Sequence, residues 1–171
     1  MRRPVRIVSP FPPPAIVLLA LFFLPLSAAQ ADERSGERLL EPSADYTPQQ
    51  VVEIVVDALR TNAATPDDAG IATVYRFASP GNRAHTGPLE RFTRMIKLGF
   101  DDMLAHVSSR FDEMRVVDDK ALQAVWLTTP SGEEVGYAFQ LGRQQGGDYD
   151  GMWMTEAVLP LGEGERSGTR I

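Results

Sequence analysis

Residues 110–161 read RFDEMRVVDDKALQAVWLTTPSGEEVGYAFQLGRQQGGDYDGMWMTEAVLPL, and this stretch decides the fold. It contains segments in which apolar and polar residues alternate, which is typical of half-buried strands. Turn-forming residues separate these segments, at residues 118–119, 130–132 and 144–151. We predict four strands, at residues 110–117, 122–128, 135–141 and 152–161. Because the connections between them are short, the strands should form an antiparallel meander.

A helix is predicted at residues 48–62. Thr47 is suited to cap it, and Pro48 is favourable in its first turn. Apolar residues recur at helical spacing, so one face of the helix should be buried. The residues predicted to form that face are Val51, Ile54, Val55, Ala58 and Leu59.

Two further helices are predicted before the strands. The first uses Asp67-Asp68 as its cap and ends at the Ser-Pro-Gly-Asn turn, residues 79–82. Its buried residues should be Ile71, Val74, Tyr75 and Ala78. The second begins at Gly87-Pro88, with Leu89, Phe92 and Ile96 facing inward. Helices followed by a meander predict an α+β fold, in which N-terminal helices pack on one face of a curved antiparallel sheet of about four strands.

The N-terminus has the pattern of an export signal. Arg2, Arg3 and Arg6 precede the apolar run at residues 15–26, and the small residues Ala29-Gln30-Ala31 follow it. The apolar run is short for a membrane span and contains a proline. We therefore expect cleavage after Ala31, no stable membrane span afterwards, and a periplasmic or secreted protein. The predicted organisation is a signal peptide at 1–31, a flexible linker at 32–46, a folded domain at 47–161 and a disordered tail at 162–171.

Composition excludes several classes of partner and chemistry. The chain has 17 Lys and Arg against 23 Asp and Glu, and removal of the three leader arginines takes its net charge from −6 to −9. Such an acidic protein repels nucleic acid and anionic membrane surfaces. The sequence has no cysteine, which excludes disulfides, thiol catalysis and sulfur-ligated metals. No metal-binding or cofactor-binding motif is present, so neither a metal nor a cofactor is predicted.

Three stretches of the chain form a set: GIATVYRFASPGN at residues 70–82, TGPLERF at 86–92 and YDGMWMT at 149–155. Together they resemble an uncharacterised family known as domain of unknown function 4864. The order of helices and meander also resembles the cone-shaped fold of the nuclear-transport-factor-2-like and ketosteroid-isomerase-like superfamily. That resemblance implies acid–base enzymes, binding modules or dimerisation modules, but it supplies no catalytic residues to carry over.

A basic segment at residues 76–97 is the main candidate for ligand binding. It holds several arginines in an acidic chain, and the predicted loop at 79–88 offers backbone amides beside a helix start. This pattern points to a small anionic ligand held by Asn82, Arg83 and Arg91. The alternative is that these arginines lie on solvated faces or pair with nearby acids.

Three residues are candidates for acid–base catalysis. His106 has acidic residues close in sequence, and a His–Asp pair acts as a general base in many enzymes. Asp112 and Glu156 are predicted near the mouth of a cavity lined by sheet aromatics. The alternative is that His106 is a hydrogen-bonded structural residue.

The sequence therefore predicts an exported protein that acts as a small-ligand-binding or dimerisation module, with an anionic or apolar ligand. One alternative is a cofactor-independent acid–base enzyme of the isomerase, dehydratase or hydrolase type. Another is an accessory subunit of an envelope complex. A homodimer through the open sheet face is also expected.

Overall fold

The structure is a computed structural model that describes residues 40–162. The predicted signal peptide and most of the predicted tail lie outside these residues. The helices are α1 (Pro48–Thr61), α2 (Ala69–Phe77), α3 (Pro80–Thr86), α4 (Leu89–Gly99) and α5 (Asp101–Ala105). The strands are β1 (Ser108–Phe111), β2 (Arg115–Val117), β3 (Lys120–Thr128), β4 (Glu134–Arg143) and β5 (Trp153–Leu161).

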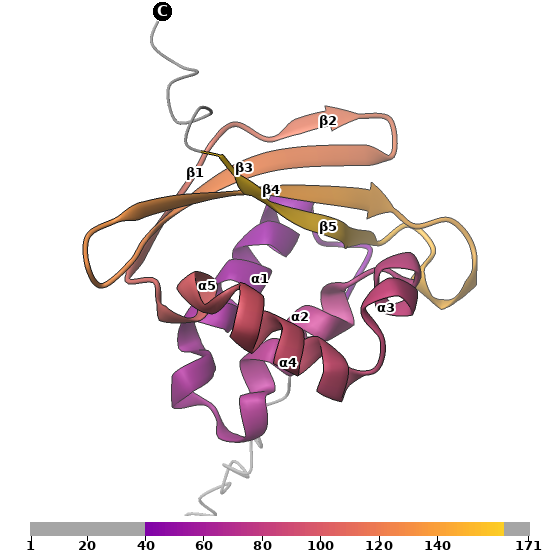
Figure 1. The fold of residues 1–171 in the computed structure, drawn as a ribbon. Helices are drawn as coiled ribbons and strands as arrows, with labels where there is room; N and C mark the ends of the chain where they lie inside the picture. The colour runs from indigo at the N-terminus through magenta and orange to yellow at the C-terminus, as the bar shows by residue number, and fades with distance from the viewer. Residues whose placement is uncertain (1–39, 163–171) are drawn as a thin grey trace, which may run out of the picture. The chain divides into compact units, whose positions relative to one another are not determined.

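The described domain has two layers. All five helices lie on one face of an antiparallel sheet whose strand order is β1-β3-β4-β5, with β2 also paired to β3 (Figure 1). The sheet is open, because its two edges do not pair with each other. The predicted α+β class and the antiparallel meander are confirmed, with five strands where about four were expected.

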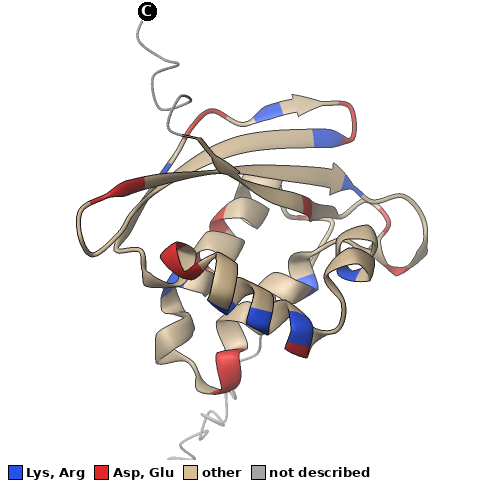
Figure 2. Cartoon of the chain, viewed as in Figure 1, with Lys and Arg blue, Asp and Glu red and all other residues tan. Residues whose placement is uncertain are grey.

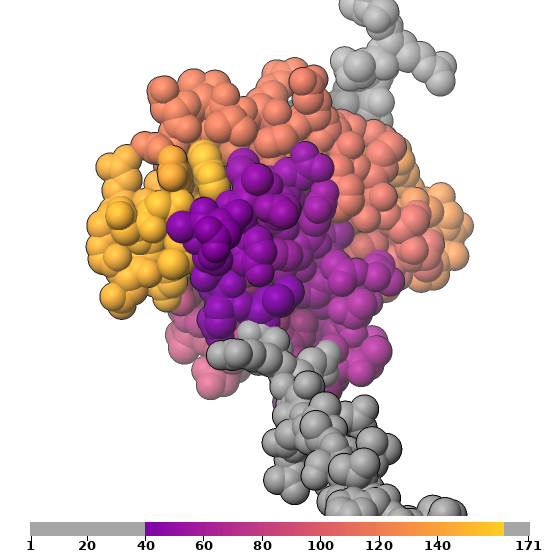
Figure 3. Space-filling model, turned by 180° about the vertical axis from the view of Figure 1, so that it is seen from behind, coloured from indigo at the N-terminus to yellow at the C-terminus, as the bar shows by residue number. Residues whose placement is uncertain are grey.

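Helix α1 supplies the largest share of the core. Thr47 and Gln50 form a reciprocal capping box at its start, which confirms the prediction that Thr47 caps this helix. Val52 and Val56 are buried in addition to the predicted stripe, whereas Ile54 and Ala58 are only partly buried. The helix packs against the sheet, α2 and α5 together, so its buried face is wider than a single stripe. Seen from the opposite side, residues 40–60 (indigo) form the middle of the surface, with the C-terminal residues (yellow) on one side of them (Figure 3).

The predicted cap of α2 is wrong. Asp67 and Asp68 adopt positive φ angles of 52° and 57°, and neither side chain bonds a helix N–H. Instead the Oδ1 of buried Asn62 accepts the N–H of Ile71 at 3.0 Å, and Asn62 Nδ2 donates to Asp68 at 3.1 Å. The end of α1 therefore caps the start of α2, which the local sequence does not reveal.

The first predicted strand is interrupted. Phe111 pairs with Val125 and Arg115 pairs with Leu122, so three residues of one strand face two residues of β3. Asp112 occupies the break, and its carbonyl accepts Gln123 Nε2 at 2.9 Å. The extra residue divides the predicted strand 110–117 into β1 and β2.

The segment at residues 79–86 is a helix rather than the predicted turn and loop. Helix α2 ends at Phe77, and Ser79 caps α3, because its hydroxyl accepts the N–H of Asn82 at 3.1 Å. The N-terminal residues before α1 also contact the domain: Glu41 pairs with Arg76 at 3.2 Å, and the Tyr46 ring lies 6.1 Å from that of Phe77. Glu41 and Tyr46, which the sequence assigned to the linker at 32–46, thus contact α2 in the structure.

Candidate functional site

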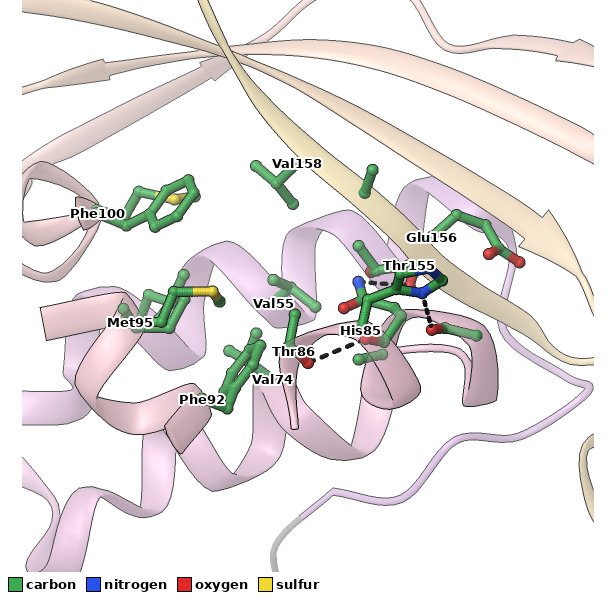
Figure 4. Close-up of a pocket in the computed structure, with 17 residues that line it drawn as sticks. Val55, Val74, His85, Thr86, Phe92, Met95, Phe100, Thr155, Glu156 and Val158 are labelled. Atoms are coloured by element: carbon green, nitrogen blue, oxygen red, sulfur yellow. Dashed lines mark hydrogen bonds between the residues drawn. The ribbon is translucent and has the colours of Figure 1, made fainter. Parts of the chain in front are cut away.

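A cavity of about 380 Å³ lies between the helices and β5. Its walls are mainly apolar and come from α1 to α5 and from β5 (Figure 4). The apolar residues labelled in that view are Val55, Val74, Phe92, Met95, Phe100 and Val158. A cavity of this size and composition is within the range that small organic ligands occupy.

Polar side chains gather at one end of the cavity. Thr155 and Glu156 come from β5, and Asn82, His85 and Thr86 come from α3 (Figure 4). Two bonds hold these elements together: Ser79 N–H donates to Thr155 O at 2.9 Å, and Asn82 Nδ2 donates to the same oxygen at 3.2 Å. The cavity therefore has a long apolar part and one polar end.

Thr155 is the most deeply buried residue of this polar end. Thr155 is 3% exposed, and its Oγ1 has no hydrogen-bond partner in the described part of the chain. An unpaired buried hydroxyl costs about 1–3 kcal/mol. Thr155 lines the cavity, but its Oγ1 has almost no accessible surface, so this atom is closed off from the open space.

Glu156 stands at a β-bulge. Gln140 pairs with Ala157 and Leu141 pairs with Thr155, which leaves Glu156 as the extra residue of β5. Its carboxylate accepts Ser79 Oγ and Gln144 Nε2, each at 3.0 Å. Bulges often re-aim a side chain beside a functional site, and Glu156 lies at the polar end of the cavity (Figure 4).

His85 and Thr86 contribute acceptors to the same end. His85 Nδ1 lies 2.7 Å from the carbonyl of Gly81. Because a carbonyl only accepts, Nδ1 must carry the proton, and Nε2 of the neutral ring is then an acceptor. Thr86 Oγ1 donates its proton to Asn82 O at 3.0 Å, which leaves that hydroxyl as an acceptor as well.

The predicted anion-binding residues are dispersed. The basic residues of the segment 76–97 are spread over α2, α3 and α4 rather than around one loop (Figure 2). Arg83 lies over two rings, 5.0 Å from the centroid of Tyr149 and 5.9 Å from that of Tyr75. Arg91 lies on the exposed side of α4 against Gly87, and Asn82 binds β5. These contacts give Arg83 and Asn82 structural roles that tie α3 to the β4–β5 connection and to β5.

His106 occupies a different part of the core. It is buried between α5 and β1, and its Nδ1 donates to Met103 O at 2.7 Å. Burial lowers the pKa of His106, because the charged ring loses its hydration. No hydrogen bond in the described part of the chain joins His106 to Asp101, Asp102 or Asp112. These contacts support the alternative interpretation of His106, in which it is a hydrogen-bonded structural residue. His106 does not line the cavity.

Asp112 also has structural partners. Its Oδ2 accepts Trp126 Nε1 at 2.9 Å, and its Oδ1 pairs with Arg110 at 2.5 Å. Trp126 lies on the sheet face away from the helices, where Gly136 leaves room for its ring. Of the three predicted acid–base residues, only Glu156 lines the cavity.

Sequence reasoning missed Thr155, Thr86 and the contribution of His85. The available signal was the stretch YDGMWMT, which ends at Thr155 and was noted only for its resemblance. Within residues 40–162, no group of three His, Asp or Glu side chains is arranged to hold a metal ion. No described helix has both the length and the apolar character needed to cross a membrane.

Residues 43–164 match the model of the family described as Domain of unknown function (DUF4864). The chain belongs to this family. It shows no significant match to a curated protein or to a solved structure. The DUF4864 match covers the whole described domain apart from its first three residues.

The DUF4864 stretches recognised in the sequence meet at the polar end of the cavity. Residues 70–82 contribute Ala78, which forms a parallel bridge to Thr155 from residues 149–155. Tyr75 OH donates to Gly87 O at 3.2 Å, which joins the first stretch to the one at 86–92. The residues that carry the family resemblance therefore surround the cavity's polar end.

Proposed function

We propose that this protein is a small-ligand-binding module whose ligand occupies the cavity between the helices and β5. The observation that carries the proposal is the cavity itself, which is walled mainly by apolar side chains and has polar side chains of α3 and β5 at one end. A ligand with an apolar body and one polar group satisfies both parts of this site. The resemblance to the nuclear-transport-factor-2-like superfamily belongs to the same proposal, and the helices-then-meander order supports it.

Binding is favoured over acid–base catalysis by the contacts of Glu156. Both of its oxygens already accept a hydrogen bond, from Ser79 and from Gln144. A general base needs an oxygen or nitrogen free to reach the substrate proton. Both Glu156 oxygens are already engaged by these two donors, so the enzyme alternative has less support.

Filling the cavity should abolish binding without unfolding the protein. Val158 lines the cavity from β5, and its neighbour Leu159 is exposed and does not line it. We expect the neutral naphthalene dye prodan to bind the parent protein with a blue-shifted emission, and Val158→Trp to lose that shift. Leu159→Trp is the matched control and should bind prodan like the parent. Equal binding by both variants, or none by the parent, would reject the cavity as a ligand site.

We further propose that the protein forms a homodimer through the sheet face opposite the helices. The large apolar residues Val117, Leu122 and Leu159 are exposed, and the strand register places them on this face. The same face carries Lys120 at one end of β3 and Glu134 at the start of β4. Charges of both signs on one patch suit a self-complementary two-fold contact.

Sedimentation of the purified protein at micromolar concentration should give a dimer. Leu122→Arg should convert it to a monomer, because the new charge would be buried in the contact. Leu98→Arg is the control, since Leu98 is exposed on α4 in the helical layer. A monomeric parent protein would contradict the dimer. The exposed sheet face would then fit the alternative of an accessory subunit that binds another protein of an envelope complex.

We also propose that the domain acts outside the cytoplasm, after removal of residues 1–31. The basis is the charged start, the apolar run and the Ala29-Gln30-Ala31 pattern. N-terminal sequencing of the exported protein should begin at Asp32. An intact Met1 on a membrane-bound product would show instead that the leader is an anchor.

A further inference from the structure

The side-chain donors at the polar end of the cavity already bind the protein's own backbone. Asn82 Nδ2 donates to Thr155 O at 3.2 Å. Thr86 Oγ1 donates to Asn82 O at 3.0 Å. His85 Nδ1 donates to the carbonyl of Gly81 at 2.7 Å. These bonds order α3 and join it to β5, and an anionic ligand, which needs several donors, finds no set of them waiting here.

No free charge faces the cavity either. Among its lining residues, all of which belong to the described chain, His85 and Glu156 are the two with ionisable side chains. Both oxygens of Glu156 accept hydrogen bonds, one from Ser79 and one from Gln144, each at 3.0 Å. A cationic ligand would therefore have to compete with two donors of the protein for this carboxylate.

The charge of Glu156 also has a cation beside it. A Cβ at Gly142 would lie 2.7 Å from Glu156 Oε1 and 3.2 Å from Lys120 Nζ, so both groups border the same small space. Lys120 belongs to β3 and does not line the cavity. The carboxylate is therefore balanced from outside the cavity, and neither of these two charges is left for a ligand.

The remaining wall is suited to hydrocarbon. Phe92 and Met95 line it from α4, Met103 lines it from α5, and Val158 lines it from β5. The Phe92 ring lies 5.3 Å from that of Tyr75, which fixes it as part of the wall. An apolar molecule gains free energy by leaving water for such surroundings. An ionic group loses its hydration there, and without a partner this loss is strongly unfavourable.

From the engaged polar end and the apolar wall we propose that the cavity selects an uncharged, largely hydrocarbon ligand and excludes both anions and cations. The hydrocarbon part lies against Phe92, Met95 and Val158. This inference rests on the proposed binding function and specifies its ligand class. Of the anionic and apolar ligands expected from the sequence, it selects the apolar one.

Displacement of prodan by three compounds with the same ring system tests the proposal. The probes are 2-naphthalenemethanol, which is uncharged, the 2-naphthoate anion and the 2-naphthylmethylammonium cation. They are compared at about pH 7.5, where an ordinary histidine is mostly neutral. We expect the alcohol to displace prodan from the parent protein at roughly tenfold lower concentration than either ion, because neither ion finds a partner in the cavity.

Met95→Lys supplies the missing partner. Met95 is half-buried on the cavity wall, and lysine has an unbranched side chain of similar length. We expect naphthoate to displace prodan from Met95→Lys at roughly tenfold lower concentration than from the parent, because a charge-assisted contact becomes available. Leu98→Lys is the matched control: it adds the same charge at an exposed position of α4 that does not line the cavity, and naphthoate should remain weak.

The outcomes separate this inference from the binding function. If either ion displaces prodan from the parent as well as the alcohol does, the selection of uncharged ligands is overturned while the cavity remains a ligand site. An equal gain for naphthoate in Met95→Lys and Leu98→Lys would also overturn it, because the missing partner would then not be a cavity property. If prodan fails to bind the parent, the proposed binding function falls, and this inference falls with it. If Met95→Lys does not fold, the order of the three probes on the parent decides alone.

Discussion

Val51→Asp should unfold the domain or leave it only marginally stable. Val51 is fully buried in the first turns of α1, in the core that joins this helix to the sheet and the other helices. A carboxylate placed there has no cation among the core side chains around it. Burying an unpaired charge costs several kcal/mol, which is comparable with the roughly 5–15 kcal/mol that stabilises a whole domain. Circular dichroism should show a lost or strongly lowered thermal transition.

Glu53→Asp is the control for this substitution. It places the same side chain two residues further along α1, at an exposed position. Its melting temperature should stay close to that of the parent, because an exposed carboxylate of either length remains hydrated. A Val51→Asp protein that melts like Glu53→Asp would mean that this face of α1 is not part of the core.

Gly70→Ala should have the second largest effect. A Cβ at this position would lie 2.1 Å from the backbone oxygen of Ala58 and 2.9 Å from Cβ of Asn62. The first of these atoms belongs to the backbone of α1, so the clash can be relieved only by moving α1 and α2 apart. That movement would also strain the bond between Asn62 and Ile71 that caps α2. We expect a loss of about 3 kcal/mol or more, and a melting temperature lower by on the order of 10 °C.

Gly99→Ala provides the matched comparison. Gly99 is the last residue of α4, and a Cβ there would meet no atom within 4 Å. The substitution should be neutral or slightly stabilising, because alanine has the higher helix propensity. If Gly70→Ala and Gly99→Ala give the same melting temperature, the close crossing of α1 and α2 is not present in solution.

The elements that the sequence predicted well are those defined by local periodicity. Alternation in 122–128 and 135–141 places β3 and β4 nearly at their observed bounds, and the apolar spacing after Thr47 places α1. Predictions failed where a distant group satisfies a local need. Asn62 caps α2 from the end of the preceding helix, nine residues before Ile71, so the adjacent Asp67-Asp68 is not used as a cap.

The candidate site was the least predictable part. Glu156 was named from the sequence, but only for an expected place near the mouth of a cavity lined by sheet aromatics. Arg83 was named for its loop, and the loop proved to be a helix whose arginine stacks on Tyr75 and Tyr149. A guanidinium in an acidic chain has many possible partners, and the choice among them depends on which rings and acids the fold brings near.

The sequence by itself determined the α+β class, the antiparallel order of the strands and the main buried face of α1. These follow from side-chain periodicity and turn residues, which act over a few neighbouring positions. Only the tertiary structure decided the cavity and its polar end. The bonds that join Ser79 to Glu156 and Asn82 to Thr155 span 77 and 73 residues, and the bulge that turns Glu156 depends on its register with β4. Because these contacts arise from packing between distant segments, no local pattern in the sequence specifies them.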